Sequence, residues 1–422
     1  MIVNRVWLRF FMVALIGFGL FPIYVNAQSL EDLQAHAVNN RKLIEAKRLS
    51  IANQDILVKR SHSNYYPKFD MRLMTSRYDD NSVTDNTSRH EYQWSMTYPI
   101  FLGLKNWYGV KNEKILKEIK TYELNSLLQD IKFQIAETYL YIFEGKSRLE
   151  VATDEYLLLK KRHEDVQNRL QVGLVNKNDV LKIKVEMDNA RQKMEKASAD
   201  YDISINEMEH QTGIAIQVDA MTFKEFNGLP EAKDYAYYKT QALNRSELKA
   251  LELLIQSKKY QTKVAQSEFY PSINLVGSYK KFHDEGFPPD SQDDEDKLIK
   301  LELTMNLFDG FNTIQTVQSE KLNEKIAECN FTELKQSIET EVKNIYLEYE
   351  VSLKNLKVAH ESIAQAEENF RITDISFQQG VATTTDVLDA IYYRSRAKYN
   401  FIYAGGELFL HYYQLQRIAD NF

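Results

Sequence analysis

Proline is scarce in this chain of 422 residues, which contains only seven. Two stretches of roughly 130 residues lack it altogether, one between Pro99 and Pro230 and one after Pro289. Proline interrupts helices because it has no amide donor and collides with the preceding turn. Since both stretches are also poor in glycine and rich in Leu, Glu, Lys, Gln and Ala, they predict long helices and a mainly α-helical protein.

Long apolar runs are also missing. After residue 27 no segment reaches the ~18 continuous apolar residues of a transmembrane helix. The apolar block at residues 10–24 follows Arg5 and Arg9 and precedes Val25-Asn26-Ala27, which is the pattern of a secretory signal peptide over residues 1–27. We therefore expect an exported protein whose mature chain begins at Gln28. If it enters a membrane, it has to do so as strands.

Cysteine and positive charge are in short supply too. The only cysteine, Cys329, cannot form an internal disulfide. The formal net charge is −7, and removing Arg5 and Arg9 with the leader leaves −9, so the basic footprint of a nucleic-acid-binding protein is absent. No histidine pair has metal-ligand spacing, and no catalytic set shares a cleft. We expect neither an enzyme nor a metal or cofactor site.

One short element, in contrast, occurs twice. QVGLVNKNDVLKI begins at Gln171 and QQGVATTTDVLDA begins at Gln378. Five positions are identical in the two, each pair lying 207 residues apart: the first glutamine, the glycines Gly173 and Gly380, and an Asp-Val-Leu triplet. A repeated element at such a distance raises the question of how much of the chain is duplicated.

The duplication covers most of the chain. Tyr66-Pro67 matches Tyr270-Pro271 with a shift of 204 residues, while Gly103 matches Gly310 with a shift of 207. The second copy therefore has three extra residues between these two landmarks. A tandem repeat of this length indicates two similar structural halves. The predicted divisions are 28–213 for the first repeat, 214–234 for a linker or equatorial segment, and 235–422 for the second repeat.

A helical run begins each half, at about residues 29–61 and 235–267, with Leu, Ile and Ala spaced three and four apart. Both runs contain an Asn-Arg pair at the same place in the repeat, Asn40-Arg41 and Asn244-Arg245. A Tyr-Pro pair follows each run. Because proline disfavours helix in the residue before it, the Tyr-Pro pair predicts a sharp end to each helix.

The segments after each Tyr-Pro pair alternate with period two. Within residues 91–98 every second residue is apolar and mostly aromatic, and residues 299–307 alternate in the same way. Segments of about ten residues with this alternation are typical of strands that face lipid on one side and water on the other. The expected strands are about 68–78, 90–99, 272–281 and 297–307, the exposed loops are 79–89 and 280–297, and the candidates for an interfacial aromatic belt are Tyr92, Tyr98, Tyr270 and Tyr279.

A long helical span follows each pair of strands. Gly103 to Gly173 and Gly310 to Gly380 are both 70 residues apart. In the second span, apolar residues recur in steps of four and three, as in a coiled coil, and 70 helical residues extend roughly 100 Å. Glycine commonly supplies the left-handed conformation that ends a helix. We therefore interpret each repeated element as a helical-hairpin tip, with returning helices at about 179–211 and 386–419.

Together these features resemble the TolC family of outer-membrane efflux proteins across essentially the whole mature chain. The resemblance is carried by the paired Tyr-Pro ends, the strand exits at 99–103 and 306–310, and the tips at 172–174 and 379–381. It implies a homotrimer in which four strands per protomer close a transmembrane β-barrel of about twelve strands, above an α-helical periplasmic tunnel. A lone four-stranded sheet would leave two unpaired edges in lipid, which independently favours an oligomer.

The resemblance also implies partners. In this family the tips dock onto the hairpins of a periplasmic adaptor, or membrane-fusion protein, which joins the tunnel to an inner-membrane pump of RND or ABC type. A role limited to closing the helices is the alternative for the glycines. The docking residues carried over to this chain are Val172, Gly173, Leu174, Gln379, Gly380 and Val381, with Arg169 nearby.

Acidic residues line the family's closed periplasmic aperture, and Asp386 and Asp389 match them here. Because they are three residues apart, they share a helix face, and threefold symmetry would turn them into rings that attract cations. Helix capping is the alternative, since Thr383 stands three residues before Asp386 as in a capping box, and acids are favoured in a first helical turn.

Asp179 matches the family position that braces the closed state against the neighbouring long-helix tip. The positions that match its partners hold Phe377 and Ala382, where the best-known member of the family has a tyrosine and an arginine. This departure weakens the expectation of a salt bridge at that place.

The sequence thus predicts the outer-membrane channel of a tripartite efflux or type I secretion system in a Gram-negative cell, with its helical body in the periplasm. It would be a passive duct, opened by the adaptor and powered by the pump. Two alternatives stay open: a periplasmic coiled-coil scaffold or adaptor that does not span the membrane, and a closed, non-conducting relative with the same fold.

Overall fold

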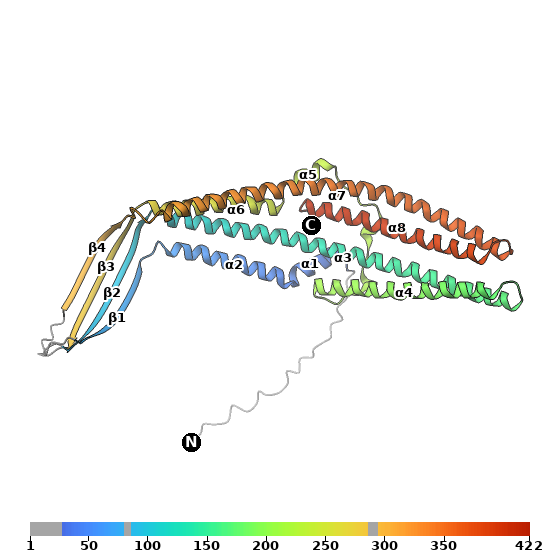
Figure 1. The fold of residues 1–422 in the computed structure, drawn as a ribbon, viewed down its shortest axis with the longest axis horizontal. Helices are drawn as coiled ribbons and strands as arrows, with labels where there is room; N and C mark the ends of the chain where they lie inside the picture. Colours follow the sequence, from blue (N-terminus) through green and yellow to red (C-terminus); the bar gives the residue numbers. More distant parts are fainter. Residues whose placement is uncertain (1–27, 80–85, 286–293) are drawn as a thin grey trace, which may run out of the picture.

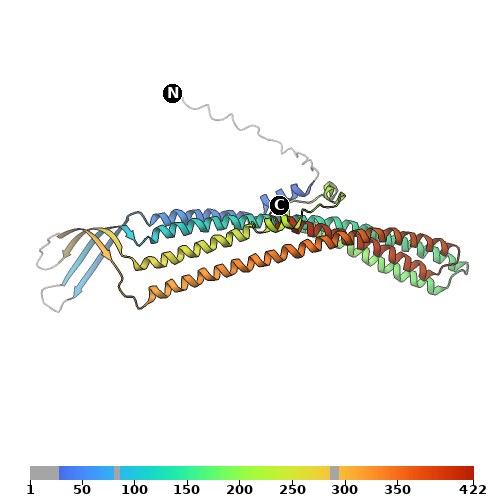
Figure 2. The same ribbon diagram turned by 90° about the horizontal axis from the view of Figure 1, so that it is seen from above.

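The computed structural model describes residues 28–79, 86–285 and 294–422. The chain forms a long, narrow body with a β-sheet at one end and two helical-hairpin tips at the other, as Figure 1 shows. The described N-terminal residues and the C-terminus both lie near the middle of its length (Figures 1 and 2). The predicted signal peptide and the centres of the two predicted strand loops lie outside the described residues.

The sheet has four antiparallel strands in the order β1-β2-β3-β4. β2 and β3, one from each half, pair in the centre, so the sheet joins the two repeats. The outer edges of β1 and β4 have no partner strand among the described residues. β4 ends three residues before the predicted 307. The strands are β1 (Lys68–Asp79), β2 (Asn86–Leu102), β3 (Ser272–Glu285) and β4 (Asp294–Thr304).

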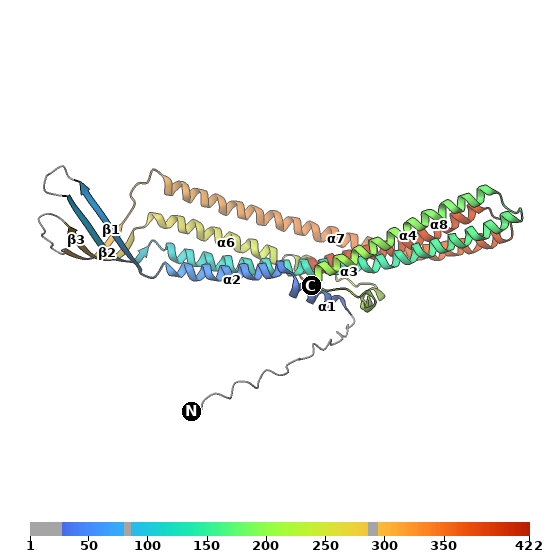
Figure 3. The same cartoon turned by 90° about the horizontal axis from the view of Figure 1, so that it is seen from below.

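The helices occur in the same order in the two halves of the chain. The longest, α3 and α7, contain 67 residues each and so extend roughly 100 Å. Each returns through a second helix, and the two hairpins lie side by side in Figures 1 and 3. The first half contains α1 (Leu30–Asn40), α2 (Lys42–Ser63), α3 (Lys105–Gln171) and α4 (Lys177–Thr212), and the second contains α5 (Tyr235–Ala242), α6 (Ser246–Gln266), α7 (Asn312–Gln378) and α8 (Thr384–Ile418).

The first helical run of each half is broken, which the apolar spacing did not predict. In the first half the break is at Arg41, where the backbone is extended with φ −67° and ψ 120°. In the second half the break separates α5 from α6, and its last residue is Arg245, where the backbone has φ −55° and ψ 145°. Both arginines belong to the Asn-Arg pair that the repeat shares. The break lets α1 turn into the core at mid-length, while α2 continues toward the sheet.

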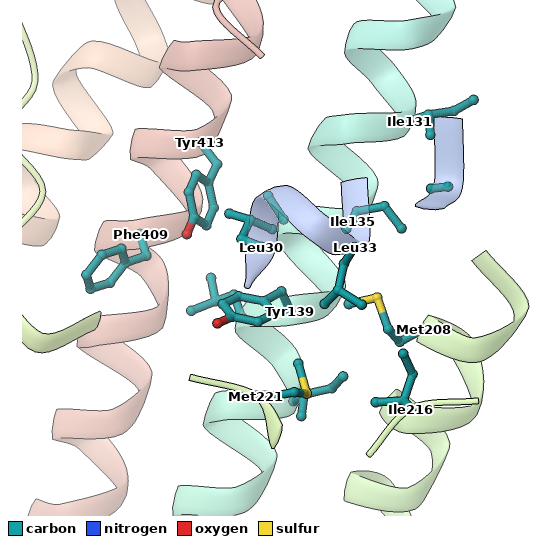
Figure 4. Packing of buried hydrophobic residues seen from close by; sticks show 14 of the residues in the cluster. Leu30, Leu33, Ile131, Ile135, Tyr139, Met208, Ile216, Met221, Phe409 and Tyr413 are labelled. Atoms are coloured by element: carbon teal, nitrogen blue, oxygen red, sulfur yellow. The ribbon is translucent and has the colours of Figure 1, made fainter. Parts of the chain in front are cut away.

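That core lies where the two halves meet. Leu33 from α1, Tyr139 from α3 and Met208 from α4 are fully buried in it, and Phe409 and Tyr413 of α8 complete it from the second half (Figure 4). The segment between the halves contributes as well, with Tyr139 Oη accepting a 2.9 Å hydrogen bond from the Phe223 amide. Burial of these large side chains supplies the main attachment between the repeats at this level.

A charged network near the C-terminus adds a second attachment at mid-length. Arg417 of α8 donates to Asp130 of α3 at 2.7 Å and to Asp420 at 3.0 Å, and it also pairs with Glu247 of α6. Burial opposes ionisation of Glu247, but Arg245 and Arg417 outweigh it and lower the pKa of that carboxyl to about 2. The network ties α3, α6 and α8 together with fully charged groups.

The chain leaves the sheet through the same turn in both halves. Gly103 and Leu104 have φ of 60° and 67°, and Gly310 and Phe311 have φ of 69° and 68°. A left-handed leucine or phenylalanine is costly, so the turn needs support from its surroundings. Gly103 is also pressed against another segment, since a Cβ there would lie 2.4 Å from the Ser267 carbonyl oxygen.

Candidate functional site

One face of the sheet is an exposed apolar surface. The side chains of Phe69, Ile299 and Leu301 are 74%, 83% and 66% exposed. Trp94 lies on the same face, directly opposite Met71 and beside Tyr279, whose ring centroid is 5.4 Å away. Such a surface suits contact with lipid rather than water, because a contiguous apolar patch is rare on soluble monomers.

The opposite face of the sheet is polar. Lys280 of β3 and Glu91 of β2 form an ion pair at 3.6 Å, and Gln93 stands opposite both Arg72 and Lys280 in the register of the strands. The alternation predicted from the sequence is therefore present across neighbouring strands. One face is suited to lipid and the other to a water-filled interior.

The other end of the molecule consists of the two hairpin tips. Gly173 and Gly380 have φ of 76° and 79°, and each is followed by a six-to-one backbone hydrogen bond, from the Leu174 amide to the Arg169 carbonyl and from the Val381 amide to the Ser376 carbonyl, both at 2.9 Å. This is the Schellman arrangement that ends helices at glycine. Both glycines are exposed, and there is open space around the position of a Cβ at each.

The residues beside these glycines expose apolar side chains to an unusual degree. Val172, Leu174 and Val381 are 70%, 71% and 79% exposed. They sit at the far end of the body, where the chain offers no further segment to cover them among its described residues (Figure 1). The tips thus present apolar points on a polar helical body, which is typical of a contact surface.

Asp386 and Asp179 cap the helices that return from the tips. The Asp386 carboxylate accepts from the Thr383 amide and hydroxyl, both at 2.7 Å, and the Thr383 hydroxyl accepts from the Asp386 amide. These bonds lower the pKa of Asp386. Asp179 forms the same capping box with Asn176. Capping therefore engages both carboxylates within the protomer.

Asp389 is placed differently. It is exposed, one turn further along α8, and lines a groove of about 670 Å³ between α4 and α8. Leu181 and Lys182 form the opposite wall, and Tyr392 extends the groove away from the tip. Of the three predicted aperture acids, Asp389 is the one that no capping box engages.

Phe377, which occupies one of the two positions expected to face Asp179, contacts arginine side chains instead. Phe377, only 3% exposed, lies beneath two arginines of α3. The Arg169 guanidinium is 4.6 Å from the ring centroid and donates to the Phe377 carbonyl at 3.2 Å, and the Arg162 guanidinium is 5.3 Å from the ring. Arg162 also forms an ion pair with Asp374 of α7. We call these four residues the tip clasp.

The tip clasp joins the ends of the two hairpins within one protomer. Sequence reasoning named Arg169 and Phe377 but missed Arg162 and Asp374. A signal existed: Arg162 stands between Leu159 and Val166 at helical spacing, on the apolar stripe of α3. A charged residue in that position predicts a buried partner. The surrounding core contains Leu159, Val166, Ile183, Ala190, Phe377, Val387 and Ile391.

Among the described residues, no helix combines the length and the apolar character needed to cross a membrane. Within those residues, no group of three or more His, Cys, Asp or Glu side chains is arranged to hold a metal ion.

The fold matches solved outer-membrane proteins. It aligns with VceC from Vibrio cholerae over 93% of this chain and 96% of that chain, with a TM-score of 0.77 and 14% identity. CmeC, an outer membrane channel of Campylobacter jejuni, gives 93% and 86% coverage, a TM-score of 0.79 and 15% identity. MtrE, the Neisseria gonorrhoeae outer membrane channel in its open state, aligns over 93% of this chain and 88% of that chain, with a TM-score of 0.77 and 15% identity.

Comparison by sequence is more restricted. No curated protein sequence matches the chain, but residues 238–406 match the family model described as outer membrane efflux protein. The matched region includes β3, β4, α7 and the tip at Gly380. Residues 238–406 are therefore similar to the outer membrane efflux protein family, and the chain as a whole has the fold of the outer-membrane channels to which it aligns.

Proposed function

We propose that this protein is the outer-membrane channel of a tripartite efflux or type I secretion system. The observation that carries the proposal is the combination of two ends in one elongated body: a sheet with an exposed apolar face and, roughly 100 Å away, two apolar hairpin tips. The sheet end suits the outer membrane and the helical body suits the periplasm. A periplasmic adaptor has no need for the apolar sheet.

The protein would act as a homotrimer. The unpaired edges of β1 and β4 need partners in lipid, and three copies supply them by closing a barrel of about twelve strands. The helices support the same assembly. Leu49 and Ile56 on α2 are 63% and 60% exposed, and Leu322 and Ile326 on α7 are 65% and 56% exposed. Apolar helix faces of this kind favour burial against a second copy.

The periplasmic end would be the gate. In a closed trimer, Asp389 and its symmetry mates would form an acidic ring beside Asp386 and Asp179, which attracts cations. The tip clasp would hold the hairpins of each protomer together in this state. Separation of the α3–α4 hairpin from the α7–α8 hairpin then requires that the Arg162–Asp374 pair be broken.

The docking surface for a periplasmic adaptor would be the two tips. The exposed side chains of Val172, Leu174 and Val381 would fit apolar positions on the adaptor's helices. Gly173 and Gly380 would allow close approach because they have no side chain to cover their backbone. Gln379, next to Gly380, would belong to the same surface. Transport would be passive, with energy supplied by an inner-membrane pump of RND or ABC type. The proposal includes neither catalysis nor a cofactor.

Electrical recording of the detergent-extracted protein in a planar lipid bilayer tests the proposal. Small, cation-selective openings that divalent cations block are expected. The scaffold alternative predicts a protein that is extracted without detergent and gives no conductance, and this result would overturn the proposed function. A closed relative would insert into the bilayer but conduct in no variant.

A further inference from the structure

A buried carboxyl group lies in the contact between the two hairpins, just beyond the mid-length core. Glu144 of α3 is 7% exposed. Its Oε1 atom occupies a notch in α8 at Gly406, where a Cβ would lie only 1.5 Å from that oxygen. Any side chain at position 406 would displace the carboxyl group. The α3–α8 contact is therefore shaped around this one acid.

A third helix closes on the same place. The next residue, Gly145, faces α4, and a Cβ there would lie 3.3 Å from Tyr201 Cδ2 and 3.4 Å from Tyr201 Cα. α3 is thus held closely between α8 and α4 at this level. Tightly packed interiors transmit local changes rather than absorb them. A change in the state of Glu144 must therefore move a neighbouring helix.

Charged and titratable groups surround the carboxyl group from each side. Arg148, one turn along α3, forms an ion pair with it, and Glu144 also lines a hollow of about 370 Å³ between α3 and α4. Two sets of groups come from two helices: Tyr141 and Arg148 from α3, and Lys193, Lys196, Asp200 and Tyr201 from α4. From α8, Tyr399 and Glu407 face the carboxyl group. Behind Glu407 lies His411, which is 3.4 Å from Glu407 and 3.7 Å from Glu348 of α7.

The balance of these groups raises the pKa of Glu144 above the ordinary value of a glutamate. Burial raises the pKa of Glu144 to about 7; Arg148 opposes this effect, and the carboxylate of Glu407 adds to it. The ion pairs of Lys193 with Glu155 at 3.2 Å and of Lys196 with Asp200 at 3.0 Å direct both lysines to other acids. Both protonation states of Glu144 are thus accessible around neutral pH.

We propose that Glu144 is a proton-binding residue of the α3–α8 contact and that loss of its proton loosens the contact between the two hairpins. The carboxyl group fills the Gly406 notch, where burial and the Glu407 carboxylate outweigh the attraction of Arg148 and disfavour the ionised form, and ionisation draws water into the contact. The consecutive glycines Gly405 and Gly406 make α8 easiest to distort at this point. This inference rests on the proposed function, and its consequence for the channel is that the tips separate more readily above neutral pH.

Hydrogen exchange of the intact, detergent-solubilised protein tests this inference without requiring conduction. Wild type is compared with Glu144→Gln at the same pH, so that intrinsic exchange rates cancel. At about pH 8 we expect residues 399–411 to exchange about threefold faster in wild type, and at about pH 5.5 the two proteins should exchange alike. The matched control is Glu150→Gln, an exposed acid on the same helix, which should behave as wild type.

Equal exchange of wild type and Glu144→Gln at high pH would overturn the proposal, and so would a difference that is the same at every pH, because that shows only a structural role. Channel recordings over the same pH range separate the two hypotheses. We expect opening to rise with pH in wild type and not in Glu144→Gln. Absence of conductance in every variant would refute the duct, while a pH-dependent exchange difference would still support the proton site.

Discussion

Arg162 of α3 and Asp374 of α7 form an ion pair that joins the two helical hairpins, and their side chains are only 8% and 22% exposed. Breaking a buried pair by removing one partner is costly, because the remaining charge loses its main compensation. Without Asp374, Arg162 would keep only the more distant and more exposed Asp165, at 3.9 Å. Separation of the hairpins relieves this cost by returning the charge to water. The pair therefore favours closed tips when intact and favours separated tips when one member is missing.

Substitution of Asp374 by Asn should open the duct. The expected shift toward separated tips is about 3 kcal/mol, seen as longer and larger openings in bilayer recordings. Arg371→Met is the matched control, because Arg371 pairs at 2.7 Å with Glu368 of its own helix and joins nothing to the other hairpin. If both variants open the duct alike, the tip clasp does not hold it closed.

The acidic residues at the tips can be separated into capping and pore-lining roles. Asp389→Ala leaves the capping boxes intact, so we expect unchanged stability but about tenfold weaker block by divalent cations, owing to the lost ring of charge. Asp386→Ala should also destabilise α8 by about 1 kcal/mol through loss of its cap. Divalent block that survives in both variants and in the double variant would contradict an acidic aperture.

Adaptor binding should depend on the apolar points at the tips. Val381→Asp places a charge in the proposed contact and should weaken binding of the adaptor's hairpin by at least 1 kcal/mol, measured with purified proteins. Leu229→Asp serves as control, because Leu229 is a similarly exposed apolar residue (62%) far from the tips. Equal binding by the two variants would place the docking surface elsewhere.

The two strand exits differ in a way that substitution reveals. Gly103→Ala and Gly310→Ala both force alanine into the left-handed region, at a cost of about 1–3 kcal/mol each. Only Gly103 faces a close neighbour, the Ser267 carbonyl oxygen, whereas the space around Gly310 is open. We expect the thermal stability of the protein to fall further for Gly103→Ala, and a larger loss for Gly310→Ala would contradict the structure.

The charged network at mid-length makes stability depend on acid pH. The pKa of Glu247 is lowered to about 2, so its contribution to stability is present above its ordinary pKa and is lost as the pH falls toward 2. Arg417→Met removes its most buried partner. Thermal unfolding should show a loss of about 3 kcal/mol at neutral pH and a smaller difference from wild type in acid, while equal losses at both pH values would contradict this assignment.

The repeat and the alternating segments made most of this architecture predictable. Gly173 and Gly380 mark the tips as predicted. The predicted fold class agrees with the solved structures, and the predicted outer-membrane efflux channel, rather than an adaptor, agrees with the family match and with the fold. These features depend on local backbone preferences and on periodicity, which a single sequence contains. The division into two repeats and a linker stays a prediction, as do the assigned docking and aperture residues.

What could not be predicted depends on contacts between distant segments. Leu104 and Phe311 are left-handed although each follows a left-handed glycine, and nothing in the sequence required a second left-handed residue at these strand exits. The breaks at Arg41 and Arg245 occur within runs of regular helical spacing, because packing of α1 into the mid-length core and of α5 against α7 and α8 overrides local preference. Glu144 looked like one more acid on a charged helix until Gly406 of the other repeat was placed against it.

The mid-length core has a mechanical consequence for the whole molecule. It fixes α1, α3, α4 and α8 to one another at the middle of a long body, so it acts as a fulcrum with one arm on each side. The arm toward the tips and the arm that carries the strands are separated by this core. In the proposed duct, the tips would therefore separate on the periplasmic side without straining the seal between the strands and the surrounding lipid.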